Sequence, residues 1–226
     1  MFKNWQKMNR IIYILGSVFI LASSLLSGKL SLLSLVTLIG TLLGFLSVAL
    51  IVNQKSQAGI VGLLSAICYI VVSFFAHNPS DMVLNICFIA VLDLPIIFDS
   101  SWNSNLKPVS IKENHKVLDN TFKLWLVVFV LLFSMEKFVL HSPRPFWSPL
   151  AGSLGIAASY LTVRKVKEAF VLWALQNFIQ IVLWSITFLS GDAPITIAIT
   201  YLFYLLNAGT SFFDDKWFGK ITKEID

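Results

Sequence analysis

The stretch FVLWALQNFIQIVLW, residues 170–184, fixes the fold class and raises the first functional question. It supplies most of a membrane-spanning helix, which needs about 17–25 residues. Its three amides, Gln176, Asn177 and Gln180, are costly there. An unpaired amide loses roughly 2–7 kcal/mol on transfer from water to an apolar medium. These side chains must therefore meet another helix, water or a ligand.

Similar apolar runs recur along the whole chain. Of its 226 residues, 57% are hydrophobic and 13% are charged, and the mean hydropathy is +0.79. A soluble domain of this size would need more charge to cover its surface. The sequence therefore predicts an all-α polytopic membrane protein. The predicted spans are residues 11–27, 30–52, 58–76, 82–98, 123–140, 146–163, 169–189 and 194–213.

The net charge of +5 indicates orientation rather than a nucleic-acid partner. If the N-terminus is cytoplasmic, all but three of the 17 Lys and Arg residues fall in inner segments, the exceptions being Lys29, Lys137 and Arg144. Because Lys and Arg in short loops favour the inner side, both termini of this multi-pass protein are predicted to face the cytoplasm, beneath the cell membrane. The two cysteines, Cys68 and Cys87, lie within spans, so we predict no disulfide, metal site or cofactor.

The long polar interruption at residues 99–122 separates two similar halves. A shift of 111 residues places Gly44 on Gly155 and Asp81 on Asp192, and the helix lengths and loop positions match. An odd number of helices inverts the next copy unless another crossing intervenes, and the span at 123–140 supplies that crossing. The predicted units are an extra N-terminal transmembrane helix (1–29), a first three-helix repeat (30–98), a cytoplasmic linker with a connecting helix (99–145), a second three-helix repeat (146–213) and a cytoplasmic tail (214–226). Parallel repeats of this 3+1+3 kind are a transporter design, with the substrate near the midplane between the repeats.

The amides of the seventh span share one helix face with two tryptophans. At about 100° per residue, Trp173, Gln176, Asn177, Gln180 and Trp184 fall within an arc of about 100°. One interpretation is hydrogen bonding between helices, worth about 0.6–2 kcal/mol per bond. The other is a ligand site, in which indoles stack on a ring and amides supply directional hydrogen bonds. The flanking tryptophans favour the ligand site and suit an aromatic, polyhydroxylated molecule.

Three further polar residues are candidates for the same site. In the last span, a stripe of polar residues includes Asn207, which is more informative than the hydroxyl residues because those can bond their own backbone. In the fourth span, Asn85 lies near the outer end and Asp93 lies two residues before Pro95, which should kink the helix. An acid within a membrane span suggests function. The alternative for Asp93 is that it reaches water or Lys107 near the cytoplasmic end.

Two segments resemble the PnuC vitamin transporters: RKVKEAFVLWALQNFIQIVLWSI, residues 164–186, and YLFYLLNAG, residues 201–209. That family shows an E-x-W-x-x-W-x-x-x-N pattern with a later Trp, then L-x-N-A in the last helix, and DMVLN at residues 81–85 is similar to its first-repeat counterpart. The resemblance covers residues 30–217 and implies a seven-helix core like that of SWEET sugar transporters. It implies substrate binding by Trp173 and Asn177, with Gln180, Trp184, Asn85 and Asn207 as plausible neighbours.

The resemblance implies facilitated uptake of nicotinamide riboside, or a related vitamin or nucleoside, by alternating access. A cytosolic kinase would act as a functional partner by trapping the substrate as a phosphate. The sequence departs from the family in having Ala-Phe after Glu168, in the end of the first repeat (LDLPIIFDSSW) and in the last helix (NAGTSFFDDKW). These departures bear on which substrate is carried. Family branches take nicotinamide riboside, thiamine, riboflavin or deoxynucleosides.

The sequence suggests two alternative classes of function. The segment KFVLHSPRP, residues 137–145, looks like the first phosphate-binding motif of membrane lipid phosphatases. The other motifs of those enzymes are missing, and with them the His nucleophile that the phosphatase reaction needs. We therefore predict that the protein is not an enzyme. A non-transporting scaffold is disfavoured by the duplicated helices and the polar stripe. The oligomeric state is left open.

Overall fold

The computed structural model describes residues 5–26, 31–103, 106–113 and 115–219. Its helices, in chain order, are α1 (Lys7–Leu26), α2 (Leu32–Val52), α3 (Gln57–Phe75), α4 (Pro79–Cys87), η1 (Phe88–Asp93), α5 (Leu94–Phe98), η2 (Ser100–Asn103), η3 (Ile111–Glu113), α6 (His115–Ser134), η4 (Met135–Val139), α7 (Trp147–Val163), α8 (Ala169–Leu189), α9 (Thr196–Ser211) and α10 (Asp215–Phe218). Of the cations used to predict orientation, Lys3, Lys29, Lys220 and Lys223 lie outside the described residues.

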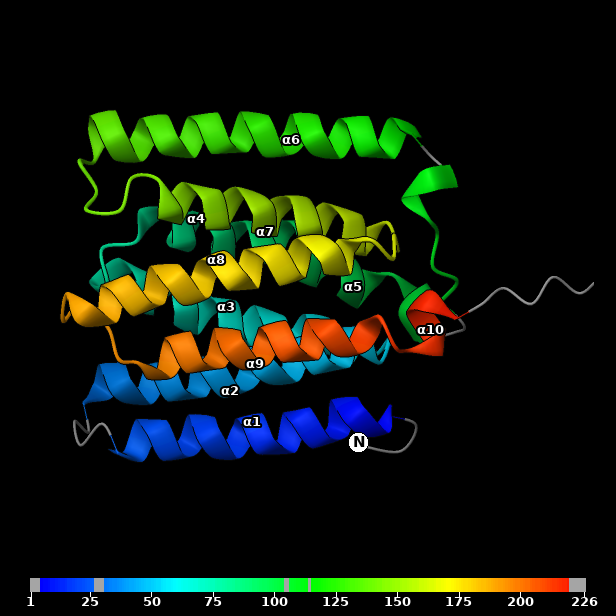
Figure 1. Cartoon of the computed structure of the whole chain (residues 1–226), viewed down its shortest axis with the longest axis horizontal. Coiled ribbons are helices and arrows are strands. Elements are labelled where there is room, and N and C mark those ends of the chain that lie inside the picture. The colour runs from blue at the N-terminus through cyan, green and yellow to red at the C-terminus, as the bar shows by residue number, and fades with distance from the viewer. Residues whose placement is uncertain (1–4, 27–30, 104–105, 114, 220–226) are drawn as a thin grey trace, which may run out of the picture.

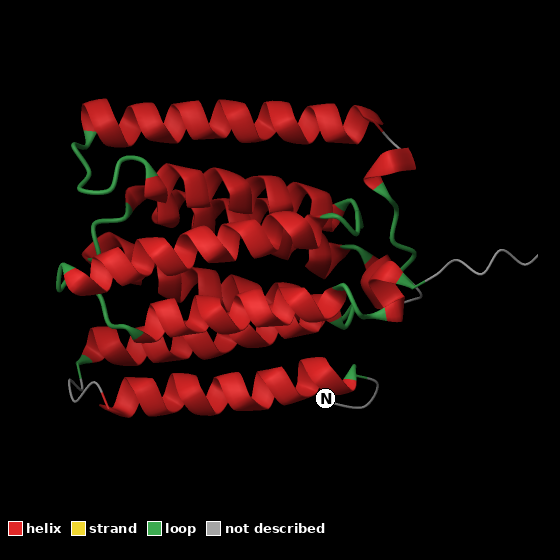
Figure 2. Ribbon diagram, in the orientation of Figure 1, coloured by secondary structure: helices red, strands yellow, loops and turns green. Residues whose placement is uncertain are grey.

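The long helices lie alongside one another in a single bundle (Figure 1). Figure 2 shows that the regular structure of the described residues is helical; one isolated bridge joins Val109 to Val166. Helix boundaries follow local chemistry. Pro79 begins α4, where its missing N–H costs nothing. Past the end of α8, Gly191 adopts a φ of 81°, a left-handed conformation that favours glycine.

Among the described residues, five helices are long and apolar enough to cross a membrane: Lys7–Leu26, Leu32–Val52, Gln57–Phe75, the broken helix Pro79–Phe98, and Ala169–Leu189. Large apolar side chains on the outside of the bundle are exposed, including Leu15 and Phe19 on α1 and Val130 on α6. Such a surface suits hydrocarbon rather than water. The prediction of an all-helical, multi-pass membrane protein is therefore confirmed. Crossing by α6, α7 and α9, which have 20, 17 and 16 residues, remains a prediction.

The central helices pack in two corresponding sets. Helix α2 packs against α3 and α9, and α7 packs against α8 and α4. The remaining long helices are peripheral: α1 covers α2 and α9, α6 covers α7, and the two lie at opposite edges of the bundle (Figure 1). The space between the central helices is where a buried site can form.

Pro95 shapes the fourth membrane-capable helix. It has no N–H for the carbonyl of Val91, four residues earlier. The N–H of Leu94 bonds instead to the carbonyl of Ile89, five residues earlier, which closes a π-type turn. The kink expected from Pro95 thus takes the form of a π-helix, η1, that ends at Asp93. Helix α3 allows η1 to come close, because a Cβ at Gly59 would lie only 2.5 Å from the Asp93 carbonyl oxygen.

Candidate functional site

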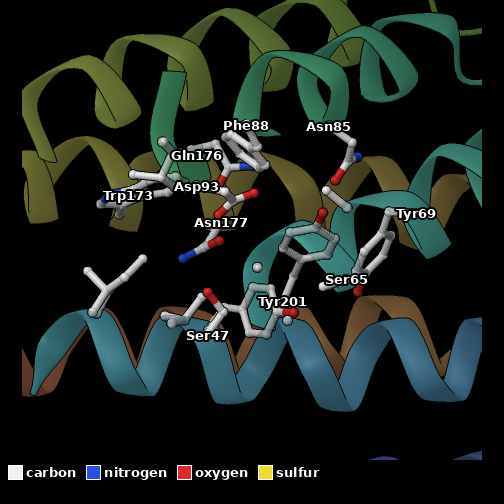
Figure 3. Close-up of a pocket in the computed structure, with 18 of the residues that line it drawn as sticks. Ser47, Ser65, Tyr69, Asn85, Phe88, Asp93, Trp173, Gln176, Asn177 and Tyr201 are labelled. Carbon is white, nitrogen blue, oxygen red and sulfur yellow. The ribbon is translucent and has the colours of Figure 1, made fainter. Parts of the chain in front are cut away.

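A cavity lies between α2, α3, the α4–η1 segment, α8 and α9 (Figure 3). Its volume is about 80 Å³. One water needs roughly 10–15 Å³ by that measure, so the space can hold a small organic molecule. The lining residues are Gly44, Ser47, Val48, Ile51, Gly62, Ser65, Ala66, Tyr69, Asn85, Phe88, Leu92, Asp93, Phe170, Trp173, Gln176, Asn177, Tyr201, Tyr204 and Ala208.

Helix α8 contributes a ring and two amides to the cavity wall. The Trp173 indole N–H donates to the Thr162 hydroxyl at 2.8 Å, and its ring centroid lies 5.6 Å from that of Phe88. Gln176 and Asn177 are buried. Within the described part of the chain, Gln176 Oε1 has no hydrogen-bond partner, and no bond of the Asn177 amide is found. These two amides therefore leave hydrogen-bonding capacity facing the cavity.

Asp93 is the acid of the cavity. Its side chain is 2% exposed and lies against α3, where a Cβ at Gly62 would collide with Asp93 Oδ1. Asp93 Oδ2 has no hydrogen-bond partner among the described residues. Nor does a salt bridge join Asp93 to Lys107 there, although the sequence offered that alternative. The glycine thus makes room for a carboxyl group that faces the cavity.

Asn85 lines the cavity and also forms hydrogen bonds within its own helix. Its amide nitrogen donates to the Asp81 carbonyl oxygen at 2.8 Å and to Asp81 Oδ2 at 3.4 Å. Sequence reasoning missed the aromatic and hydroxyl residues around it, notably Tyr69, Tyr201 and Tyr204. The signal available was the three-residue spacing of Tyr201 and Tyr204, which places both on one face of a helix.

Two residues of the predicted stripe on α8 do not line the cavity. The Gln180 amide donates to Asp81 Oδ1 at 2.7 Å, and Asp81 Oδ2 accepts from the Ser73 hydroxyl at 2.6 Å. Trp184 is fully buried in an apolar cluster of α1, α2, α3, α8 and α9. Neither residue is among those that line the cavity, although Gln180 Oε1 and the Trp184 indole N–H have no hydrogen-bond partner among the described residues.

The polar stripe of α9 faces α1 rather than the cavity. Asn9 donates to Asn207 Oδ1 and accepts from the Asn53 amide, the latter at 2.7 Å. At the other end, Ser23 donates to the Thr196 hydroxyl at 3.3 Å. Asn207 is therefore not brought to the cavity, because the peripheral helix α1 supplies its partner. The cavity face of α9 is the neighbouring one, which carries Tyr201 and Tyr204.

Polar contacts join the loops at both ends of the bundle. At the end predicted to face outward, buried Arg144 pairs with Asp192 and donates to the Ala76 carbonyl and the Asn78 side chain. The Arg of the phosphatase-like segment is thus occupied in joining loops. At the other end, Glu168 accepts from the Ser110 hydroxyl at 2.7 Å and from the Ile111 N–H at 2.9 Å.

The linker is also fastened to the α7–α8 turn by an ion pair. Lys165 Nζ lies 2.9 Å from Asp99 Oδ2. A hydrogen bond from Ser101, and then that from Lys165, lower the pKa of the Asp99 carboxyl to about 2. The Asp99 carboxylate therefore stays charged throughout the physiological pH range.

This arrangement defines a helical membrane protein with a cavity between its central helices. The chain belongs to the nicotinamide mononucleotide transporter family, whose sequence model matches residues 34–218. This confirms the resemblance to PnuC seen in residues 164–186. Helix α1 lies outside the matched region.

One relative and one solved structure extend this result. The chain is 24% identical over 174 residues to the nicotinamide riboside transporter PnuC of Neisseria mucosa, covering 73% of this chain. The match spans 65% of that relative, just under two thirds of its length. A crystal structure of the vitamin B3 transporter PnuC is similar with a TM-score of 0.74 and 16% sequence identity, covering 94% of this chain and 91% of that one. The structural similarity shows a shared fold.

Proposed function

We propose that the protein carries nicotinamide riboside, or a closely related vitamin, across the cell membrane by facilitated diffusion with alternating access. The observation that carries this proposal is the part of the cavity wall that α8 forms. There an indole and two amides line the cavity, and the amides have polar groups without a hydrogen-bond partner in the described chain. An aromatic ring bearing a carboxamide and a ribose fits that chemistry. The family and the named relative support the same substrate class.

We assign the substrate site to Trp173, Gln176, Asn177, Asn85 and Asp93, all of which line the cavity. Trp173 provides a face for stacking, which is worth about 0.5–1.5 kcal/mol beyond the area it buries. The amides provide donors and acceptors for the carboxamide and hydroxyl groups. Gln180, Trp184 and Asn207 are assigned to packing that holds this wall in place.

We also propose that the core is the 3+1+3 parallel repeat, with α1 as the extra helix and both termini cytoplasmic. Support comes from positions 111 residues apart that line one cavity: Gly62 with Trp173, Ser65 with Gln176, Ala66 with Asn177, and Asp93 with Tyr204. The packing of α2 on α9 and of α7 on α4 has the same symmetry. The first repeat contributes small side chains where the second contributes a ring and amides, and this difference leaves room for a ligand.

The direct test is uptake into proteoliposomes that contain only this protein. Labelled nicotinamide riboside should equilibrate without ATP or another nucleotide, because no P-loop sequence is present to use one. A cytosolic kinase would then be needed only for accumulation. Uptake that requires ATP would contradict the mechanism. Release of phosphate from lipid phosphates would instead support the phosphatase alternative.

Nicotinamide mononucleotide should be a poor substrate. None of the described residues that line the cavity is Lys, Arg or His, so a phosphate group would be buried without a counter-charge. We expect mononucleotide to compete with labelled riboside at least about 100-fold less well than unlabelled riboside, given a desolvation penalty of several kcal/mol per ion. Competition in the same proteoliposomes measures the ratio. Equal competition would place a phosphate site where the structure has none.

Riboflavin, thiamine and deoxynucleosides are the alternative substrates. A thermal-shift panel on the purified protein separates them, because a ligand at 100-fold excess over its Kd adds about 2.7 kcal/mol to the free energy of unfolding. We expect the largest shift with nicotinamide riboside.

A further inference from the structure

We propose that the cavity selects a permanently cationic aromatic ring, and that the Asp93 carboxylate is its counter-charge. This inference rests on the proposed function of the cavity as a substrate site. It divides the substrates still open for the family into two groups. Nicotinamide riboside carries a pyridinium ring and thiamine a thiazolium ring, whereas riboflavin and deoxynucleosides are neutral.

The first step in the inference is that Asp93 has no cation of its own. Its carboxyl group is buried, and Oδ2 has no hydrogen-bond partner in the described chain. The salt bridges found among the described residues, Arg144–Asp192 and Lys165–Asp99, lie outside the cavity. None of the described residues that line the cavity carries a positive charge. The described residues therefore leave the negative charge that Asp93 can bear without a counter-charge.

The second step is that the local fold directs the Asp93 carboxyl group toward the cavity. Figure 3 shows Asp93 and Asn177 extending from separate helices into the same space. The π-helix η1 ends at Asp93, and π-turns of this kind occur often at functional sites. Gly62 leaves the carboxyl group room that any other side chain would remove. An acid held in a membrane span without a partner is expensive, which is why such acids usually serve a function.

The third step is that aromatic rings line the same cavity as the carboxyl group. The walls carry Trp173, Phe88, Tyr69, Tyr201 and Tyr204. The face of an aromatic ring is electrostatically negative and attracts a cation, most strongly when water is excluded. A cavity lined by a carboxylate and aromatic rings favours an organic cation over a neutral ring of the same shape. The same surroundings disfavour an anion.

The test compares two ligands that differ in charge but hardly in shape: nicotinamide riboside and its 1,4-dihydro form, which is neutral. Wild-type protein in proteoliposomes should take up the cation at least about 10-fold more efficiently than the neutral form. The Asp93→Asn change should lower kcat/KM for the cation by about 1,000-fold, as expected for loss of one charge pair about 4 Å apart at an effective dielectric of about 20. Uptake of the dihydro form should change less than about threefold, because a neutral ring has no ion pair to lose.

The matched control is Asp119→Asn, the same chemical change on an exposed residue of α6. It should leave both rates unchanged. If Asp93→Asn does not fold, the wild-type preference for the cation over the dihydro form still decides. A second comparison of charge is how well thiamine, a cation, and a deoxynucleoside, which is neutral, each compete with labelled nicotinamide riboside.

The outcomes separate this inference from the proposed function. Equal wild-type uptake of both forms, or equal loss of both in Asp93→Asn, overturns the role of Asp93 but leaves the transporter assignment intact. Uptake that needs sodium and ignores substrate charge also overturns it, because the cation at Asp93 would then be the metal ion. Uptake of neither form by wild-type protein contradicts the proposed function itself. Uptake of labelled thiamine but not of nicotinamide riboside supports the charge rule and moves the substrate to thiamine.

Discussion

Uptake of nicotinamide riboside should fall by at least about 100-fold in the Asn177→Ala variant, while the free energy of unfolding changes by less than about 1 kcal/mol. The amide of Asn177 makes no hydrogen bond within the described chain, so truncating it leaves no protein group unpaired. A bound substrate, in contrast, would lose the bonds that this amide makes to it. A group left unpaired in a buried site costs about 1–3 kcal/mol, and two such losses account for the expected factor.

The control for this variant is Phe178→Ala, one residue along the same helix. Phe178 is 55% exposed on the outside of the bundle, so its truncation should leave uptake intact. Initial rates in proteoliposomes give the transport effect, and thermal unfolding in detergent gives the stability effect. Normal uptake by Asn177→Ala would remove this residue from the site.

Trp173→Ala should abolish uptake as well, but with a measurable loss of stability. Its indole donates to the Thr162 hydroxyl and packs against Phe88, so its truncation removes protein contacts in addition to the stacking face. Trp173→Phe should restore most of the stability because it keeps a ring in the same space. Unchanged uptake in both Asn177→Ala and Trp173→Ala would end the assignment of the site.

The sequence predicted the helices well because their signal is local. Apolar runs of the right length mark them without knowledge of the neighbours. The expected runs at 58–76, 146–163 and 169–189 match α3, α7 and α8 to within two residues at each end. A kink near Pro95 was also predictable, because the missing N–H is a property of the residue. Its form, a π-helix that ends at Asp93, depends on how closely α3 approaches.

The sequence could not decide which polar side chains of a stripe meet the ligand. A helical wheel shows the direction of a side chain on its own helix, but not which neighbour occupies that direction. Asn177 and Gln180 lie only about 60° apart on the wheel. One faces the cavity, and the other meets Asp81 on α4. On α9, Asn207 is as polar as any candidate, yet α1 lies in its direction.

The small residues that line the cavity could not be predicted from the sequence for a related reason. Gly62 and Ala66 matter because they are small opposite Trp173 and Asn177, and smallness on one helix has meaning only against the partner helix. The proposed internal repeat contains that information, because these pairs are 111 positions apart. Positions related by the proposed repeat are thus better candidates for a shared cavity than the most polar face of each helix.

Asp81→Ala should show the opposite pattern from Asn177→Ala, with a large loss of stability. The Asp81 carboxyl is 1% exposed and accepts hydrogen bonds from Ser73 on α3 and Gln180 on α8, at 2.6 and 2.7 Å. Truncation leaves these buried donors unpaired. We expect a loss of about 3–5 kcal/mol in the free energy of unfolding, and a fall in Tm of about 10 °C. Asp119→Ala, at an exposed position, should cost less than about 0.5 kcal/mol.

The folded fraction of the Asp81→Ala protein should still transport nicotinamide riboside, because Asp81 does not line the cavity. Gln180→Ala should behave in the same way with a smaller loss, about 1–2 kcal/mol, since one donor is removed and Asp81 keeps Ser73. Rates per folded molecule and unfolding curves from the same preparations provide both readouts. Stable Asp81→Ala and Gln180→Ala proteins without uptake would place this pair in the substrate path. The division of α8 into a cavity face and a packing face would then be wrong, since one face would serve both the ligand and α4.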